Sequence, residues 1–187
     1  NQITRFYSKN NSALKSDKIQ SLLIAKGKMY IGSDEGLGIT SLNDAGALED
    51  VLSIEFSSPI IRIFAIEENH SVGVITKNDI KIFKDGKIIQ NIAIKAPLES
   101  VKTLENGEYL LTSNYHKNGI LLTSNDSSIL DVEEINLPIT PRNIFVDNEE
   151  GIWLVGDEGL HRSSNIASPV TKQSLIKLDE EHISRSK

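Results

Sequence analysis

The sequence contains no cysteine, and this absence excludes several classes of protein at once. Without thiols the chain has no disulfide framework, no Cys-x-x-Cys redox site and no thiolate zinc site. The compartment stays open, because a cysteine-free chain folds equally well in a reducing and in an oxidising space.

Basic charge and long apolar runs are also scarce. The 187 residues carry 20 Lys and Arg against 26 Asp and Glu, a formal net charge of −6. Nucleic acid would need a basic patch, so we expect no nucleic-acid partner. No apolar run approaches the roughly 20 residues of a membrane-spanning helix, and no basic-then-apolar leader opens the sequence. We therefore expect no membrane contact by this segment, but neither absence is a sign of a cytoplasmic protein.

The usual signatures of catalysis are missing as well. There is no Gly-x-Ser-x-Gly turn, no Gly-x-Gly-x-x-Gly loop and no Walker phosphate loop. The four histidines lack the spacings by which two ligands share one face of a helix or strand. We therefore predict no catalytic residue, no metal and no cofactor. The histidines are His70, His116, His161 and His182.

Isoleucine, by contrast, is abundant, with 26 copies among 187 residues. A β-branched side chain favours pleated, half-buried positions. No apolar pattern with helical spacing extends beyond one or two turns. The composition therefore favours an all-β fold.

A repeat of about 41 residues runs through the sequence. Residues 28–39 and 151–162 each hold an aromatic residue, a short apolar stretch and then Asp-Glu-Gly-Leu. Asp34 and Asp157 begin these two acidic pairs and lie 123 positions apart, which is three times 41. Two weaker copies lie between them, at residues 71–82 and 107–122. The positions taken as equivalent are Tyr30, Gly73, Tyr109 and Trp153.

Each repeat divides into four short β patterns that are separated by tight polar turns. Asp85-Gly86 between two apolar runs is the strongest short-range signal for a hairpin. The predicted strands are residues 19–25, 28–32, 37–42 and 51–56; 61–67, 71–76, 79–84 and 88–96; 101–104, 109–113, 120–123 and 129–135; and 143–147, 152–155, 160–163 and 174–178.

Four-stranded antiparallel units of 40–45 residues are typical of β-propeller blades. A β-sandwich is the alternative, but it does not require four similar copies. We therefore predict an all-β segment of four four-stranded antiparallel blades and one orphan N-terminal strand at residues 2–7, which belongs to a larger propeller. The predicted blades span residues 16–59, 60–97, 98–140 and 141–183, and residues 1–15 hold the outer strand of a preceding blade.

Four blades either close on themselves or form an arc of a larger ring, since propellers usually have four to eight blades. An arc would expose two blade faces that need a cover. We expect this cover to be the remaining blades of a parent protein or a second copy of the chain. For a chain of this length we expect a homodimer.

The first and fourth repeats resemble the two-component regulator propeller repeat. That pattern has an outer strand, an Asn-Ser-Leu-like loop, an Ile-x-x-Leu strand, then Leu-Trp-Ile-Gly-Thr and a Gly-Leu. The second repeat departs from it at Gly73, where the aromatic residue belongs, and the third has a longer loop. The resemblance rests on residues 3–7, 10–14, 17–22, 28–33 and 35–37 of the first repeat, and on residues 144–147, 151–156 and 159–160 of the fourth.

Propellers of this family typically form the extracytoplasmic sensor half of membrane-bound signalling proteins. Histidine kinases and their hybrid forms are the commonest outputs, with diguanylate cyclases as another, and gut-type Bacteroides relatives often sense oligosaccharides. The family normally has more blades, an Ig-like domain, a transmembrane helix and output residues, none of which this sequence contains. The resemblance therefore implies a non-enzymatic segment of a sensor at the periplasmic or extracytoplasmic face of a bacterial inner-membrane protein.

The loops indicate where a ligand would bind. In an up-and-down blade, the loop between the second and third strands emerges on the same face as the link to the next blade. Polar side chains gather there, and they suit a small polar ligand such as a carbohydrate, although plain solvation explains most of them individually. The longer loop of the third repeat is the best candidate. The candidate residues are Asp34, Glu35, Asn114, Tyr115, His116, Lys117, Asn118, Arg142, Asp157 and Glu158.

Three functions fit these observations, and a non-enzymatic sensor segment is the preferred one. A protein-interaction scaffold is the first alternative, since a fold alone does not select a function. A glycan-active enzyme is the second, and it would need two carboxylates about 5–10 Å apart in one pocket. We interpret the two Asp-Glu pairs as solvated turns and residues 147–151 as a hairpin turn. We expect Tyr30, Tyr109 and Trp153 to pack between blades.

Overall fold

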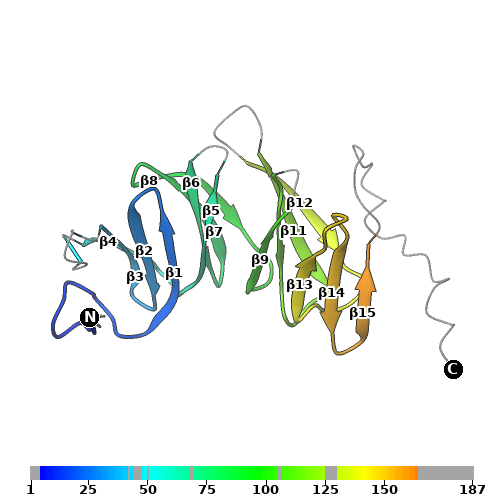
Figure 1. Cartoon of the computed structure of the whole chain (residues 1–187), viewed down its shortest axis with the longest axis horizontal. Coiled ribbons are helices and arrows are strands. Elements are labelled where there is room, and N and C mark those ends of the chain that lie inside the picture. Colours follow the sequence, from blue (N-terminus) through cyan, green and yellow to red (C-terminus); the bar gives the residue numbers. More distant parts are fainter. Residues whose placement is uncertain are drawn as a thin grey trace, which may run out of the picture. The chain divides into compact units, whose positions relative to one another are not determined.

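The computed structural model describes residues 5–41, 43, 48–49, 51–67, 70–104, 107–124 and 130–163. Across these residues the chain forms fifteen β-strands and no helix (Figure 1). The chain divides into two compact units, one of residues 1–99 with 127–129 and the other of residues 100–126 with 130–187. Each unit contains two antiparallel sheets and is described by itself.

The first unit contains the first and second sheets. In both, the spatial order of the strands is their order along the chain, and neighbouring strands are antiparallel. The first sheet consists of β1 (Ile19–Ala25), β2 (Lys28–Ser33), β3 (Gly36–Thr40) and β4 (Leu52–Glu55). The second sheet consists of β5 (Ile60–Ile66), β6 (Ser71–Thr76), β7 (Asp79–Lys84) and β8 (Lys87–Ala93).

Tight turns join these strands where the sequence predicts them. Lys26 and Gly27 have φ values of 51° and 71°, and Asp85 and Gly86 have φ values of 51° and 77°. Two successive positive φ values are the geometry of a type I′ turn, whose twist matches that of the flanking strands. The Asp-Gly hairpin that we predicted between β7 and β8 is therefore confirmed.

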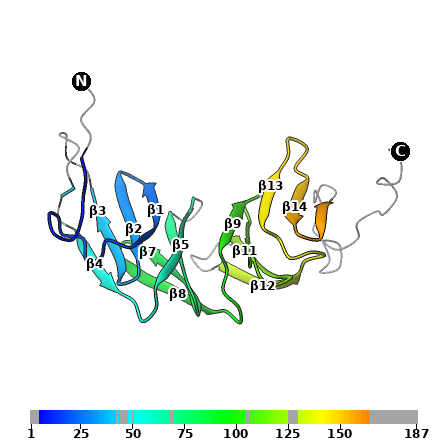
Figure 2. The ribbon, with the colours of Figure 1, turned by 90° about the horizontal axis from the view of Figure 1, so that it is seen from below.

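The first and second sheets pack face to face around a shared apolar core. β1 and β5, the first strands of the two sheets, lie side by side (Figure 2). Both carry an irregularity at the same position, between Ile19 and Ser21 in β1 and between Ile60 and Arg62 in β5. Across the interface the backbone N–H of Ile63 donates to Ser21 Oγ at 2.9 Å. The buried core consists of Leu37, Ile39, Ile60, Ile63, Val72, Val74 and Phe83.

The second sheet compensates for the glycine that replaces an aromatic residue in its second strand. Gly73 pairs with Phe64 of β5, at the position where the first sheet pairs Tyr30 with Leu23. A Cβ atom at position 73 would lie 2.2 Å from the Phe64 ring, so the ring fills the space that a side chain at 73 would need. In the second sheet the neighbouring strand therefore supplies the aromatic ring, which covers the glycine.

The second unit contains the third and fourth sheets, which are built in the same way. They too are antiparallel and keep the order of the chain. The third sheet consists of β9 (Ser100–Thr103), β10 (Tyr109–Thr112), β11 (Asn118–Ser124) and β12 (Leu130–Asn136). The fourth consists of β13 (Asn143–Val146), β14 (Ile152–Gly156) and β15 (Gly159–Arg162). Their shared core consists of Leu104, Leu110, Leu121, Leu137, Ile139, Ile144, Ile152 and Leu154.

One predicted equivalence between the repeats is wrong by one residue. The sequence pattern places Tyr109 with Tyr30, but the structure places Leu110 there. Leu110 belongs to the core between the third and fourth sheets, just as Tyr30 packs on the core between the first and second. Tyr109 is buried on the opposite face of β10. The extra residues in the following loop hide this offset, because they let either residue be aligned with the aromatic position.

The predicted all-β fold of four-stranded antiparallel blades is confirmed for the first three sheets. Such up-and-down sheets are the blades of a β-propeller. The fourth sheet shows three strands among the described residues, and the strand predicted at residues 174–178 lies outside them. The blade bounds remain a prediction.

The predicted N-terminal strand at residues 2–7 is not present in its described half. Arg5, Phe6 and Tyr7 lie outside any strand, and residues 2–4 fall outside the described part of the chain. Phe6 is 81% exposed. A strand needs a neighbour to pair with, and among the described strands none pairs with this segment.

Candidate functional site

The ten candidate residues divide between the two units. Asp34 and Glu35 form the turn between β2 and β3 in the first unit. The other eight belong to the second unit. They lie in the loop between β10 and β11 and at the start of β11, on the link between the third and fourth sheets, and in the turn between β14 and β15. These eight are Asn114, Tyr115, His116, Lys117, Asn118, Arg142, Asp157 and Glu158.

In the first unit, Asp34 fastens the segment before β1 to the turn after β2. Its Oδ1 accepts a hydrogen bond from Ser16 Oγ at 2.5 Å, and its Oδ2 lies 3.3 Å from Lys18 Nζ. The Ser16 hydroxyl, and after it the Lys18 ammonium, lower the pKa of the Asp34 carboxyl from its ordinary value. Asp34 therefore links two segments of the first unit, and it is less solvated than our interpretation as a solvated turn implied.

Glu35 is exposed beside a recess that is too small for an organic ligand. The recess has a volume of about 20 Å³ and is lined largely by apolar side chains, among them Leu14, Ile31 and Val51. This volume corresponds to about one water molecule, whereas ligand pockets typically measure several hundred Å³. Among the described residues, the recess beside the Asp-Glu pair of the first unit is therefore too small to hold a ligand.

In the first three sheets, a hydroxyl at the end of the second strand shapes the turn that follows, a signal that our prediction did not use. Ser33 Oγ accepts from the N–H of Glu35 at 3.3 Å, and Thr76 Oγ1 accepts from the N–H of Asn78 at 3.2 Å. In the third sheet Ser113 Oγ accepts from the N–H of Tyr115 at 3.2 Å. A side-chain hydroxyl that accepts from the N–H two residues later is a recurrent turn motif. A Ser or Thr two residues before the loop tip is readable in all three repeats.

In the second unit, two ion pairs connect three separate segments. Arg142 Nη2 lies 2.8 Å from Asp157 Oδ2, and Lys117 Nζ lies 2.8 Å from Glu158 Oε2. Lys117 Nζ also donates to the carbonyl oxygen of Pro138 at 3.2 Å. The loop between β10 and β11, the link before β13 and the turn between β14 and β15 therefore meet, as the up-and-down topology predicts.

The aromatic residue of the third-repeat loop stands open beside these ion pairs. Tyr115 is 69% exposed. The hydrogen bond that Arg142 donates to Asp157 is the largest cause of the raised pKa of Arg142, and Tyr115 adds a smaller contribution. Arg142 in turn lowers the pKa of the Asp157 carboxyl. His116 and Asn118 are exposed in the same loop, and Asn114 is half-buried.

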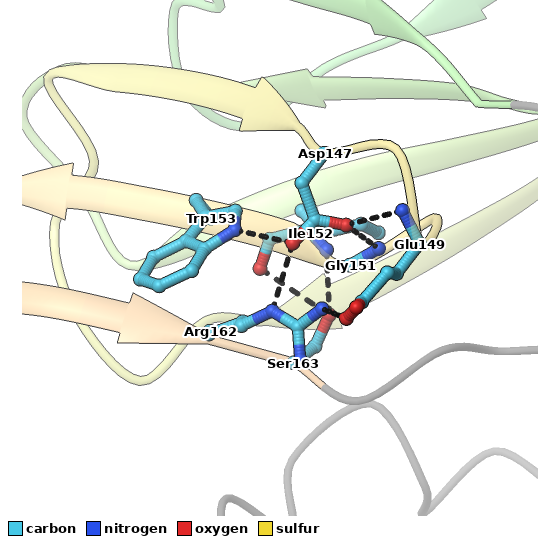
Figure 3. A network of polar contacts seen from close by, with 7 residues as sticks. All are labelled: Asp147, Glu149, Gly151, Ile152, Trp153, Arg162 and Ser163. Atoms are coloured by element: carbon cyan, nitrogen blue, oxygen red, sulfur yellow. Dashed lines mark hydrogen bonds and ion pairs between the residues drawn. The ribbon is translucent and has the colours of Figure 1, made fainter.

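A second polar network surrounds Asp147 (Figure 3). Asp147 Oδ2 accepts from Trp153 Nε1 at 2.7 Å and from Arg162 Nε at 2.8 Å. Asp147 Oδ1 accepts from the N–H groups of Glu149 and Gly151 at 3.0 and 2.7 Å. Arg162 and Trp153 are the largest causes of a pKa of the Asp147 carboxyl far below its usual range.

This network confirms that residues 147–151 form a hairpin turn. Arg162 also lies over the Trp153 ring, with its guanidinium carbon 5.6 Å from the ring centre. Trp153 is therefore held within its own sheet. Tyr30 instead packs against the core between two sheets, which is what we expected of Tyr30, Tyr109 and Trp153 alike. The acid and its partners lie 6 and 15 positions apart. Such a network therefore cannot be predicted from a short sequence motif.

The described ranges contain no group of three His, Asp or Glu side chains that is placed to hold a metal ion. In the part of the chain that the structure describes, no helix is long and apolar enough to cross a membrane.

The solved structures most informative for this chain are two extracellular domains described as parts of hybrid two-component systems from B. thetaiotaomicron. One is 20% identical with a TM-score of 0.63 and covers 84% of this chain and 22% of that domain. The other is 20% identical with a TM-score of 0.58 and covers 80% of this chain and 20% of that domain. This chain therefore spans about a fifth of their length.

Virginiamycin B lyase from Staphylococcus aureus is also similar, at 14% identity and a TM-score of 0.56, over 81% of this chain and 57% of the lyase. No family model matches the sequence, and no curated protein does. Identities at this level show a shared fold, that of propeller blades, and do not select between a sensor and an enzyme.

Proposed function

We propose that this chain is a non-enzymatic segment of the extracytoplasmic sensor propeller of a bacterial membrane-bound two-component protein. The observation that carries the proposal is that the sequence and the structure point to the same class of protein. The first and fourth repeats resemble the two-component regulator propeller repeat, and the folded chain is similar to two extracellular domains of hybrid two-component systems. These domains also belong to much longer proteins than this chain.

The ligand site of this segment is the surface of the second unit around Tyr115, Lys117, Arg142, Asp157 and Glu158. It offers an exposed phenol ring and two ion pairs. An exposed aromatic ring stacks on the apolar face of a sugar, while charged side chains bind its hydroxyl groups. The site therefore suits a small polar ligand, with an oligosaccharide as the favoured class.

The pKa values of the two aspartates in the Asp-Glu pairs argue against a glycan-cleaving enzyme. A general acid needs a raised pKa, so that it carries a proton at neutral pH. The pKa values of Asp34 and Asp157 are instead lowered, by Ser16 and by Arg142. Glu158 pairs with Lys117. The Asp34 and Asp157 carboxyls therefore lack the raised pKa that a general acid needs.

An oligosaccharide array, followed by isothermal titration with any sugar that binds, tests this function. Tyr115→Ala removes the stacking surface and should weaken binding at least tenfold, which is about 1.4 kcal/mol. Phe6→Ala is the matched control, since Phe6 is an exposed aromatic residue of the other unit and its loss should leave the affinity unchanged. An array without a single bound sugar would overturn the carbohydrate proposal, and chemical turnover of a bound sugar would overturn the sensor proposal.

A further inference from the structure

In the part of the chain that the structure describes, the fourth sheet presents an exposed apolar face. Phe145, Val155 and Leu160 lie on this face and are between 43% and 57% exposed. The opposite face carries Ile144 and Leu154, which are buried against the third sheet. We call the exposed set Phe145, Val155 and Leu160 the trailing face.

The register shows that the trailing face corresponds to a face that is buried elsewhere in the chain. Phe145 pairs with Trp153 and Val155 pairs with Leu160, as Leu23 pairs with Tyr30 and Gly32 pairs with Leu37 in the first sheet. In the first sheet the second sheet covers this face. Leu37 is 1% exposed there, against 50% for Leu160.

The first sheet has a partly open apolar face of its own, on the side away from the second sheet, where Ile31 is buried and Leu14 and Val51 border a small recess. Ile19, Leu22 and Ile24 of β1 lie on it and are between 40% and 64% exposed. We call this set the leading face. By register, Leu22 stands where the second sheet has Ile63 and the fourth sheet has Ile144. Both of those isoleucines are buried against the preceding sheet.

The two open faces are thus the two halves of an interface that the chain already builds once in each unit. In both internal copies the first strands of the two sheets touch, β1 with β5 and β9 with β13. Leu22 lies on β1 and Phe145 lies on β13, the strands that such an interface would use.

Two polar and steric details agree with this correspondence. Asn143 stands at the position of Ser21, whose side-chain oxygen accepts a hydrogen bond from the covering strand. Val155 stands at the position of Gly32, but the third sheet has Thr112 there, fully buried. A β-branched side chain at this position is therefore compatible with a covering sheet.

We propose that, in the absence of further blades, the trailing face of this chain binds the leading face of a second copy, in a head-to-tail contact. Such a contact joins two different patches, so two copies form a closed ring if both contacts can be made at once, and longer assemblies if they cannot. This inference concerns assembly alone and does not depend on the proposed ligand.

The test uses two variants that each disable one face, Leu22→Lys and Phe145→Lys, with molar masses measured by sedimentation equilibrium. The unaltered chain should associate, and each variant alone should be monomeric. An equimolar mixture of the two should form a 1:1 dimer, because the intact trailing face of one fits the intact leading face of the other. Circular dichroism checks that both variants fold, and Leu52→Lys, an exposed leucine outside both faces, should associate like the unaltered chain.

Three results would overturn the proposal. The first is an unaltered chain that stays monomeric, as it would if another part of the chain covered a face. The second is one variant that remains dimeric while the other is monomeric, since this shows like-to-like pairing of one face. The third is that each variant on its own, although folded, associates as strongly as the unaltered chain.

Discussion

The turns at Asp34 and Asp157 share the sequence Asp-Glu-Gly-Leu but differ in their surroundings. In both, the glycine has a positive φ, 138° at Gly36 and 124° at Gly159, so the four residues specify the same kind of turn. The leucine that follows is buried in the first sheet and half exposed in the fourth. Local sequence therefore sets the turn, whereas the neighbouring sheet decides how much of it is buried.

The two leucines should show the largest difference in stability. Leu37→Ala removes a side chain from a closed core and should lower the free energy of unfolding by about 2–5 kcal/mol. Leu160→Ala should cost less than about 1 kcal/mol, because its side chain is half exposed. Both are measured by urea unfolding in a chain that carries Leu22→Lys, so that association does not contribute. Equal losses would show that a cover already buries Leu160.

The two glycines separate backbone strain from packing. Alanine at either position must adopt a positive φ, which costs roughly 1–3 kcal/mol. A Cβ at position 36 would also lie 2.3 Å from the carbonyl oxygen of Ile54, whereas a Cβ at position 159 meets open space. Gly36→Ala should therefore have the lower urea midpoint of the two. The reverse order would contradict the packing of β3 on β4 at this turn.

The two aspartates should show the smallest difference, and it should depend on pH. The pKa of each carboxyl is lowered in the folded chain, so each stabilises the fold above its unfolded pKa of about 4 and loses this effect as the pH falls. The Asp34 side chain is 26% exposed, against 78% for Asp157. Solvent and salt therefore screen Asp157 more strongly.

Melting temperatures measured from pH 7 to pH 3 test this difference. Asp34→Asn should flatten the decline of the melting temperature with falling pH more than Asp157→Asn does. Added salt should reduce the effect of Asp157→Asn first. Identical profiles for the two variants would mean that the Ser16 and Lys18 contacts of Asp34 do not persist in solution.

Strands and turns were predictable because their signals are local. Alternating apolar residues and Asp85-Gly86 predicted twelve strands of the first three sheets to within a few residues. The meander topology followed from the repeat. The described half of the predicted orphan strand, residues 5–7, was the exception, since a strand depends on a partner that its own sequence does not contain.

The rest depended on contacts between distant residues. Phe64 replaces the aromatic residue that Gly73 lacks, and no pattern within β6 shows this. Topology correctly predicted that three segments of the second unit meet, but the ion pairs that join them, such as Arg142 with Asp157, could not be read from any one segment. The one-residue offset at Tyr109 arose because the sequence shows that a residue is aromatic and not which face of a strand it lies on.

The proposed function is tested most directly by chemical-shift mapping of the ¹⁵N-labelled chain with an oligosaccharide selected on the array. The turn at Asp157 belongs to the proposed site, and the turn at Asp34 serves as the internal control. The largest shifts should fall on residues 114–118, Arg142 and the turn at Asp157, while the matching turn at Asp34 should stay unchanged. Shifts that centre on Asp34 and Glu35, or equal shifts at both turns, would contradict it.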